Sequence, residues 1–100
     1  MSLSGDYGKP RPALVVQSDL FAPHPSVTLL PITSALIDGV PLLRPTLAPD
    51  AGNGLVRPSQ IMVDKISTIA RDKVGEPFGR LSEAAMAEVT RLLAVFLGLG

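Results

Sequence analysis

Short apolar runs interrupted by proline and glycine occupy most of this chain, and they limit what it can fold into. Runs of about four to eight apolar and β-branched residues between turn residues are typical of strands. A proline within such a run is tolerated mainly at the edge of a sheet. The sequence therefore predicts strands at residues 12–17, 27–32, 40–47, 61–66 and 77–81, with the proline-containing 40–47 segment at an edge.

One helical pattern, residues 82–98, follows these runs. Ser82 can accept a hydrogen bond from an early helical amide, and Glu83 suits the positive start of a helix. Apolar residues recur at helical spacing at Met86, Val89, Leu93 and Phe96. Further apolar residues at 92, 95, 97 and 99 widen the apolar stripe, so we expect burial on two sides, with a partner subunit covering one of them.

Several short strands followed by one terminal helix predict a small α+β domain on a strongly bent sheet or barrel. The chain has 100 residues, so we expect one domain spanning 1–100. One alternative for residues 1–4 is that they derive from an expression vector. The longest apolar run, 92–99, is half the length of a membrane span, and no secretory signal opens the chain.

Composition excludes several kinds of chemistry. The chain has no cysteine, which excludes disulfides, thiolate zinc sites and cysteine nucleophiles and fits a cytoplasmic location. His24 is the only histidine, which excludes a two-histidine nuclease and a histidine metal cluster. Nine basic residues balance nine acidic ones, so any site for a polyanion must be a local patch. No phosphate loop or Gly-x-Ser-x-Gly elbow is present.

Arginine, hydroxyl and carboxylate groups remain as candidates. Arg11 stands between two prolines, so its guanidinium extends from a stiff backbone and could hold a phosphate through two hydrogen bonds. Thr33 and Ser34 end a predicted strand, where a solvated or packing role is equally open. Asp64 and Lys65 lie within the predicted strand 61–66, which would direct their side chains to opposite faces.

Four short motifs occur together in this chain: GKPRPALVV (8–16), LPITS (30–34), VDKI (63–66) and GRLS (79–82). In order and spacing they resemble the MazF/PemK family of toxin ribonucleases. The resemblance implies an SH3-like barrel with a terminal helix, a homodimer, and cleavage of single-stranded mRNA without a metal or other cofactor. It also implies a cognate antitoxin that blocks the groove.

By position, Arg11 corresponds to the arginine of the family's Arg-Pro motif and Thr33 to its catalytic threonine. The resemblance implies attack by the ribose 2′-hydroxyl, which gives a 2′,3′-cyclic phosphate and a 5′-hydroxyl. A fixed guanidinium and a hydroxyl donor suit the negative charge that builds on the phosphorus oxygens. Asp64 corresponds to an acidic family position, but Lys65 stands where glutamine is usual. The expected substrate contacts are Lys9, Ser34, Arg57, Ser59, Gln60, Asp64 and Lys65, with Lys9 and Arg57 attracting phosphates.

The chain departs from the family pattern at its start, where the usual first strand is predicted to be missing. A missing strand would expose a sheet edge and weaken the site. This keeps open a non-catalytic barrel module that binds a protein partner, either as a gyrase-type poison or by titrating antitoxin. The gyrase poisons carry a tryptophan near the chain end, whereas this chain has none and ends in Gly-Leu-Gly.

Overall fold

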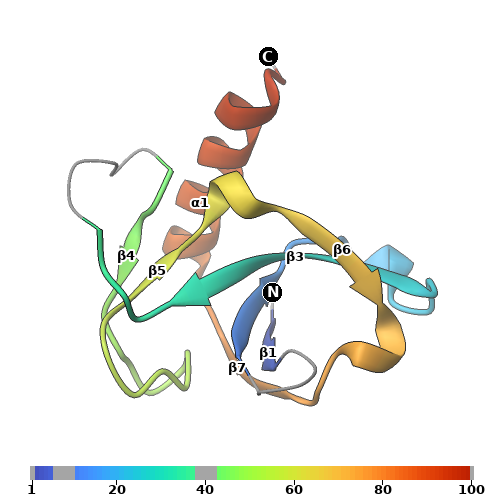
Figure 1. Ribbon diagram of the computed structural model, residues 1–100, viewed down its shortest axis with the longest axis horizontal. Coiled ribbons are helices and arrows are strands. Elements are labelled where there is room, and N and C mark those ends of the chain that lie inside the picture. Colours follow the sequence, from blue (N-terminus) through green and yellow to red (C-terminus); the bar gives the residue numbers. More distant parts are fainter. Residues whose placement is uncertain (1, 6–10, 38–42, 100) are drawn as a thin grey trace.

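The computed structural model describes residues 2–5, 11–37 and 43–99, with backbone only for 2–5. The described chain forms seven strands and one long helix (Figure 1). The strands are β1 (Ser2–Gly5), β2 (Pro12–Val15), β3 (Ser26–Thr33), β4 (Thr46–Leu47), β5 (Ser59–Ile61), β6 (Ser67–Ala70) and β7 (Pro77–Arg80); the helix is α1 (Glu83–Leu97). Three single 3-10 turns are interspersed: η1 (Asp19–Phe21), η2 (Val63–Lys65) and η3 (Arg71–Lys73).

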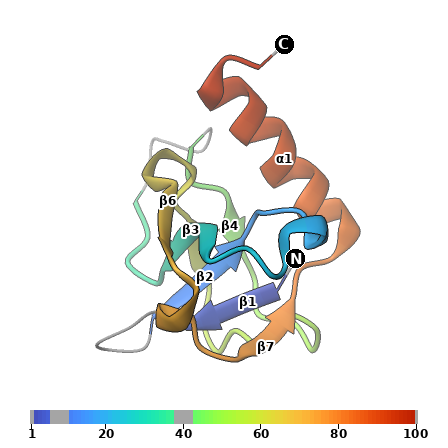
Figure 2. The same cartoon turned by 90° about the vertical axis from the view of Figure 1, so that its right-hand side faces the viewer.

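The strands lie in the sheet in the order β4-β5-β3-β2-β1-β7, and β6 also pairs with β3. All of these pairs are antiparallel. The sheet curls into a half-barrel, and the helix covers one open side (Figures 1 and 2). This confirms the expected α+β domain on a strongly bent sheet. β3 is the central strand, because it pairs with β2, β5 and β6.

The core fills the concave side of the sheet. Both faces of β3 carry buried residues, because Val27 and Leu29 are buried on one face and Leu30 and Ile32 on the other. The buried cluster joins both ends of the chain and consists of Leu14, Leu30, Ile32, Ile61, Val63, Leu81, Val89 and Leu92. The helix contributes Val89 and Leu92, so residues near its middle anchor it to the core.

The helix begins and ends as its sequence predicts. The Ser82 hydroxyl accepts a hydrogen bond from the Ala85 amide at 3.1 Å. Gly98 ends the helix in the left-handed region, with φ of 72°, where a residue without a Cβ is favoured. The C-terminal half projects beyond the sheet (Figure 2), and Val95, Phe96 and Leu97 remain 41–53% exposed. No helix in the described ranges is long and apolar enough to cross a bilayer.

The prediction of a missing first strand is wrong. Ser2–Gly5 forms β1, which pairs with β2 on one side and with β7 on the other. Its sequence, Ser-Leu-Ser-Gly, carries little strand signal. The unpaired backbone edges of β2 and β7 nevertheless provide partners for any extended segment between them.

The strand predicted at 61–66 is also wrong in part. The strand ends at Ile61, and the chain then forms the turn η2, where the Lys65 amide donates to the Met62 carbonyl at 3.0 Å. Val63 is buried from this turn, so an apolar run that looked like a strand belongs partly to a 3-10 turn. In the predicted 40–47 edge strand, residues 40–42 lie outside the described residues. The remainder contains β4, which is at the sheet edge as expected.

Candidate active site

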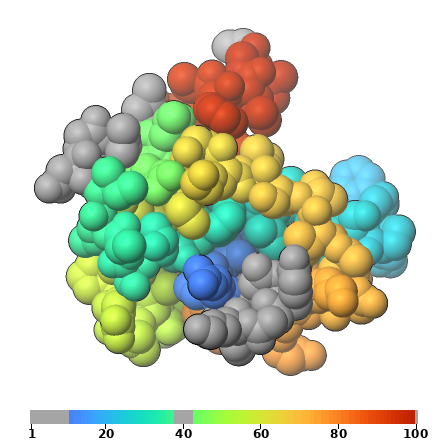
Figure 3. All heavy atoms as spheres, viewed as in Figure 1, coloured from blue at the N-terminus to red at the C-terminus, as the bar shows by residue number. Residues whose placement is uncertain are grey.

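A cavity of about 340 Å³ lies where the starts of β2 and β5 meet the end of β3. It brings together five of the residues expected at the site: Arg11, Thr33, Ser34, Arg57 and Ser59. Pro12, Ile32, Leu55 and Val56 complete its lining. Figure 3 shows the chain segments that carry these residues, blue, blue-green and yellow-green, next to one another on one face of the molecule.

Strand register explains why Arg11 and Thr33 converge. β2 and β3 pair with Ala13 opposite Pro31 and Leu14 opposite Leu30. Continuing this register by two residues beyond Ala13 brings Arg11 opposite Thr33. Directly opposite residues of an antiparallel pair lie on the same face with Cβ atoms about 5 Å apart. The observed pairs end at Ala13 and Pro31, and just beyond this end Arg11 and Thr33 line the same cavity although 22 positions separate them in sequence.

The cavity is electropositive. Arg11 and Arg57 are exposed, and no hydrogen bond or ion pair engages either guanidinium within the described chain. The lining residues include no aspartate or glutamate. Two arginines without carboxylate partners at one polar hollow form a site suited to a phosphate group, which accepts paired guanidinium hydrogen bonds.

The hydroxyl of Thr33 is held in position by the backbone. Its Oγ1 accepts a hydrogen bond from the Ala35 amide at 3.0 Å. Since that bond uses an oxygen lone pair, the hydroxyl proton stays available to a ligand. Ser34 is exposed beside it, whereas Ser59 is buried and donates to the Arg57 carbonyl at 3.0 Å. Ser59 therefore fixes the backbone of Arg57.

Three of the expected substrate contacts within the described residues do not line this cavity: Gln60, Lys65 and Asp64. Gln60 is 5% exposed, and its amide group accepts from the Ile37 amide and donates to the Ile37 carbonyl, both at 3.0 Å. The side chain therefore holds the segment after β3 against β5. Lys65 is exposed on η2, away from the cavity lining. Lys9 lies outside the described residues.

Asp64 forms an ion pair that the sequence did not reveal. Its carboxylate accepts from Nε of Arg44 at 2.9 Å and from Nη2 at 3.3 Å. These hydrogen bonds hold the pKa of Asp64 below its ordinary value of 3.8, against the opposing effect of burial. Because Asp64 belongs to a turn, the predicted opposite facing of Asp64 and Lys65 does not apply. No local sequence pattern indicates that Arg44 forms this ion pair, since Asp64 lies 20 positions away.

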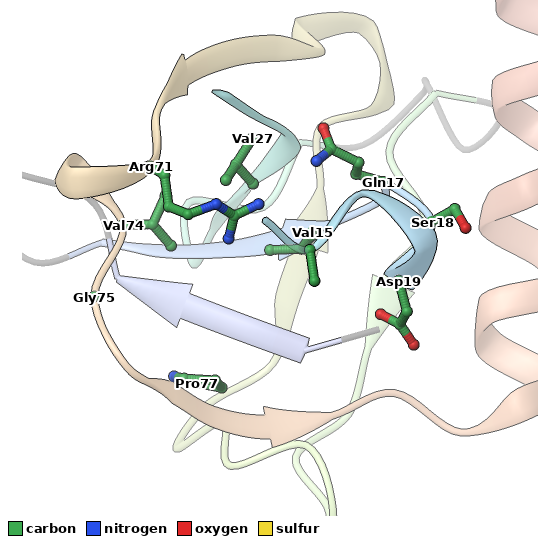
Figure 4. Close-up of a pocket in the computed structure, with 10 residues that line it drawn as sticks. Val15, Gln17, Ser18, Asp19, Val27, Arg71, Val74, Gly75 and Pro77 are labelled. Carbon is green, nitrogen blue, oxygen red and sulfur yellow. The ribbon is translucent and has the colours of Figure 1, made fainter. Parts of the chain in front are cut away.

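A separate hollow, of about 330 Å³, lies away from this site between β2, η1 and the segment after η3 (Figure 4). Arg71 extends into it but is already used by the fold. Its Nε donates to the His24 carbonyl at 2.6 Å, and its Nη2 donates to the Phe21 carbonyl at 3.4 Å. Gln17 is similarly bound to backbone groups of Ser26 and Thr28. These contacts close the hairpin between β2 and β3. Across the described ranges, no group of three histidine, cysteine or acidic residues could hold a metal ion.

Comparisons with known proteins agree on one family. The family model described as "PemK-like, MazF-like toxin of type II toxin-antitoxin system" matches residues 2–97. A Mycolicibacterium smegmatis protein named "Probable endoribonuclease MazF" is 42% identical over 92 residues, which cover 92% of this chain and 84% of that protein.

Solved structures share the fold. The Mycobacterium tuberculosis toxin MazF-mt6 superposes with a TM-score of 0.86 at 24% identity, covering 100% of this chain and 99% of that one. The MazE-MazF structure (Form-II) from Deinococcus radiodurans gives 0.77 at 22% identity, with coverage of 99% and 93%. An endoribonuclease with its cognate antitoxin from a mycobacterial species gives 0.76 at 21% identity, with coverage of 99% and 94%.

Proposed function

The chain belongs to the PemK-like, MazF-like toxin family of type II toxin-antitoxin systems, and from this we propose that it is a metal-independent endoribonuclease of single-stranded mRNA. The observation that carries the proposal is the cavity shared by Arg11 and Thr33. Its two unpaired guanidinium groups and its hydroxyls match a phosphodiester in charge and hydrogen-bonding capacity.

In the proposed reaction the 2′-hydroxyl of the substrate attacks the adjacent phosphorus. The 2′-hydroxyl gives up its proton to water as it attacks, the P–O bond to the 5′-oxygen of the next nucleotide breaks, and that oxygen takes a proton from water and leaves as a 5′-hydroxyl. The other product ends in a 2′,3′-cyclic phosphate. Arg11 hydrogen-bonds the non-bridging oxygens, which gain negative charge in the transition state, and the Thr33 hydroxyl donates a hydrogen bond to the same oxygens. Arg57 and Ser34 contact the flanking backbone.

The partners in this proposal are a second copy of the chain and a cognate antitoxin, and the location is the cytoplasm. Supporting a homodimer, the exposed apolar side chains of Val95, Phe96, Leu97 and Leu99 gather at the projecting end of α1. Supporting an antitoxin, the D. radiodurans and mycobacterial relatives were solved with theirs. Light scattering of the purified protein tests the dimer, and a charge-reversed R11E variant tests whether antitoxin reaches the cavity.

The test of activity uses single-stranded RNA in excess chelator, with assay of the cleaved ends. We expect cyclic-phosphate ends from the wild type and a loss of at least about 100-fold in rate for Arg11→Ala or Thr33→Val. Cleavage that survives Arg11→Ala contradicts the assignment of the site. Intact RNA together with tight antitoxin binding would instead support the non-catalytic module.

A further inference from the structure

A second cavity adjoins the proposed active site. It measures about 420 Å³, within the range of small-ligand sites. Arg11, Pro12, Leu55 and Val56 line both cavities, so the two form one continuous depression with Arg11 between them. Gly54, Gly75, Glu76 and Phe78 line this cavity but not the proposed active site. An RNA strand whose phosphate lies at Arg11 can therefore place a neighbouring part of the same strand in the second cavity.

The wall of this cavity is apolar and partly aromatic. Phe78 is 45% exposed and Val56 is 87% exposed, although both are large apolar side chains. One side of the Phe78 ring is close to backbone, since a Cβ placed on Gly54 would lie 2.8 Å from the ring carbon Cδ1. The Gly54 backbone thus restricts the ring at Cδ1 while 45% of the side chain remains exposed, and a stacking platform for a planar group needs such exposure.

Hydrogen bonds hold the loop under this ring in one conformation. The Asp50 carboxylate accepts from the amides of Gly52 and Asn53 at 2.8 and 2.7 Å. The buried Asn53 side chain accepts from the Leu55 amide at 3.0 Å and donates to the Ala48 carbonyl at 2.9 Å. The cavity wall is therefore formed before any ligand arrives, which lowers the entropy cost of binding.

Glu76 supplies the polar group of the cavity. Its carboxylate has no hydrogen-bond or ion-pair partner within the described residues. A phosphate is disfavoured beside it, whereas a group with two parallel N–H donors can satisfy both carboxylate oxygens. Among the nucleobases, guanine presents such a pair on its Watson–Crick edge, through its ring N1–H and its exocyclic amino group.

We propose that this second cavity, the Phe78–Glu76 pocket, binds the guanine base of the nucleotide next to the phosphate held at Arg11. The base stacks on Phe78 and contacts Val56, and its two donors bind the Glu76 carboxylate. This inference rests on the proposed endoribonuclease function and specifies its substrate: single-stranded RNA with guanine at one fixed position beside the cleaved bond.

Two measurements test the pocket. The first is cleavage of a random-sequence RNA pool, with the ends sequenced, by the wild type, Phe78→Ala and Glu76→Gln. Phe21→Ala and Glu83→Gln serve as matched controls, because both side chains are exposed and lie outside the two cavities. The second is titration of the protein with a guanosine dinucleotide carrying 2′-O-methyl riboses, which cannot be cleaved, followed by NMR at the Gly54 amide beside the ring.

We expect guanine to be enriched at one position next to the cut. Phe78→Ala should slow cleavage by about 5-fold to 150-fold, and Glu76→Gln should remove the guanine preference while cleavage of the other sequences continues. The controls should behave as wild type, and the dinucleotide should shift the Gly54 amide. If the wild type cleaves without this preference, or both variants retain it, the pocket assignment fails and the proposed function stands. If the wild type does not cleave, the proposed function fails, and an unshifted Gly54 amide would overturn the pocket as well.

Discussion

Substituting Gly79 tests how firmly β7 is held against the loop that walls the proposed site. A Cβ at Gly79 would lie 2.3 Å from the Asn53 carbonyl oxygen and 2.9 Å from the Gly52 carbonyl oxygen. Both atoms belong to backbone, and the hydrogen bonds of Asn53 keep that backbone in place. The alanine variant can therefore fold only if β7 and the loop move apart.

The expected loss of stability follows from what that movement disrupts. Overpacking a rigid contact costs about 1–3 kcal/mol. Separation also removes the hydrogen bond from the Arg80 amide to the Gly52 carbonyl, 2.8 Å long, which contributes about 0.5–1.5 kcal/mol. Gly79→Ala should thus lower the free energy of unfolding by about 2–4 kcal/mol, or the melting temperature by about 10–30 °C in a domain of this size.

Two other glycines provide controls for the thermal-unfolding assay. At Gly52 a Cβ would meet its nearest atoms at 3.5 and 3.6 Å, so Gly52→Ala should be neutral or stabilise by up to about 1 kcal/mol. At Gly98 nothing lies within 4 Å, and Gly98→Ala should cost only the left-handed backbone penalty of about 1–2 kcal/mol. One kcal/mol of unfolding free energy corresponds to roughly 4–8 °C in melting temperature. A Gly79→Ala protein that melts within about 2 °C of the Gly52→Ala protein would therefore refute the reasoning.

Three further predictions concern charge and capping. Arg11→Lys keeps the charge but loses the paired guanidinium donors, so kcat for RNA cleavage should fall about 100-fold, whereas Arg91→Lys on the exposed face of α1 should leave it unchanged. Asp64→Asn should lower the free energy of unfolding at pH 7 by about 1–2 kcal/mol. The pKa of Asp64 is lower in the folded state, so the wild type should exceed the variant in free energy of unfolding by the full amount above pH 3.8. This difference should disappear as the pH falls through the lowered pKa. A difference that persists at lower pH in urea titrations contradicts this. Ser82→Ala should cost about 1 kcal/mol in the same titrations, since it removes the acceptor for the Ala85 amide, and an unchanged midpoint would count against that cap.

Much of the fold could be predicted because its signals are local. The cap at Ser82 and the apolar repeat at Val89 locate α1, and the β-branched run of β3 locates the central strand. Strand β1 could not be predicted in the same way. Its pairing depends on the free edges of β2 and β7, which are formed by residues distant in sequence.

The site shows the same division. Arg11 and Thr33 could be named from motifs, but their meeting depends on the register between β2 and β3, which the sequence does not display. Both Gln60 and Asp64 were expected to contact substrate, Asp64 by its correspondence to an acidic family position and Gln60 without a motif. The structure binds their side chains to partners 23 and 20 positions away, which no local pattern displays. Phe78 and Glu76 carried no motif, and only the cavity made them visible.

The β2–β3 register also determines which length changes the chain can tolerate over evolution. Residues 16–25 connect β2 to β3, and this connection can gain or lose residues without altering which residues of the two strands pair. Deleting a single residue inside Pro12–Val15 would instead turn the arginine that precedes it toward the opposite side of the ribbon. Homologues should therefore vary in the length of this connection and keep the length of the short strand before it constant.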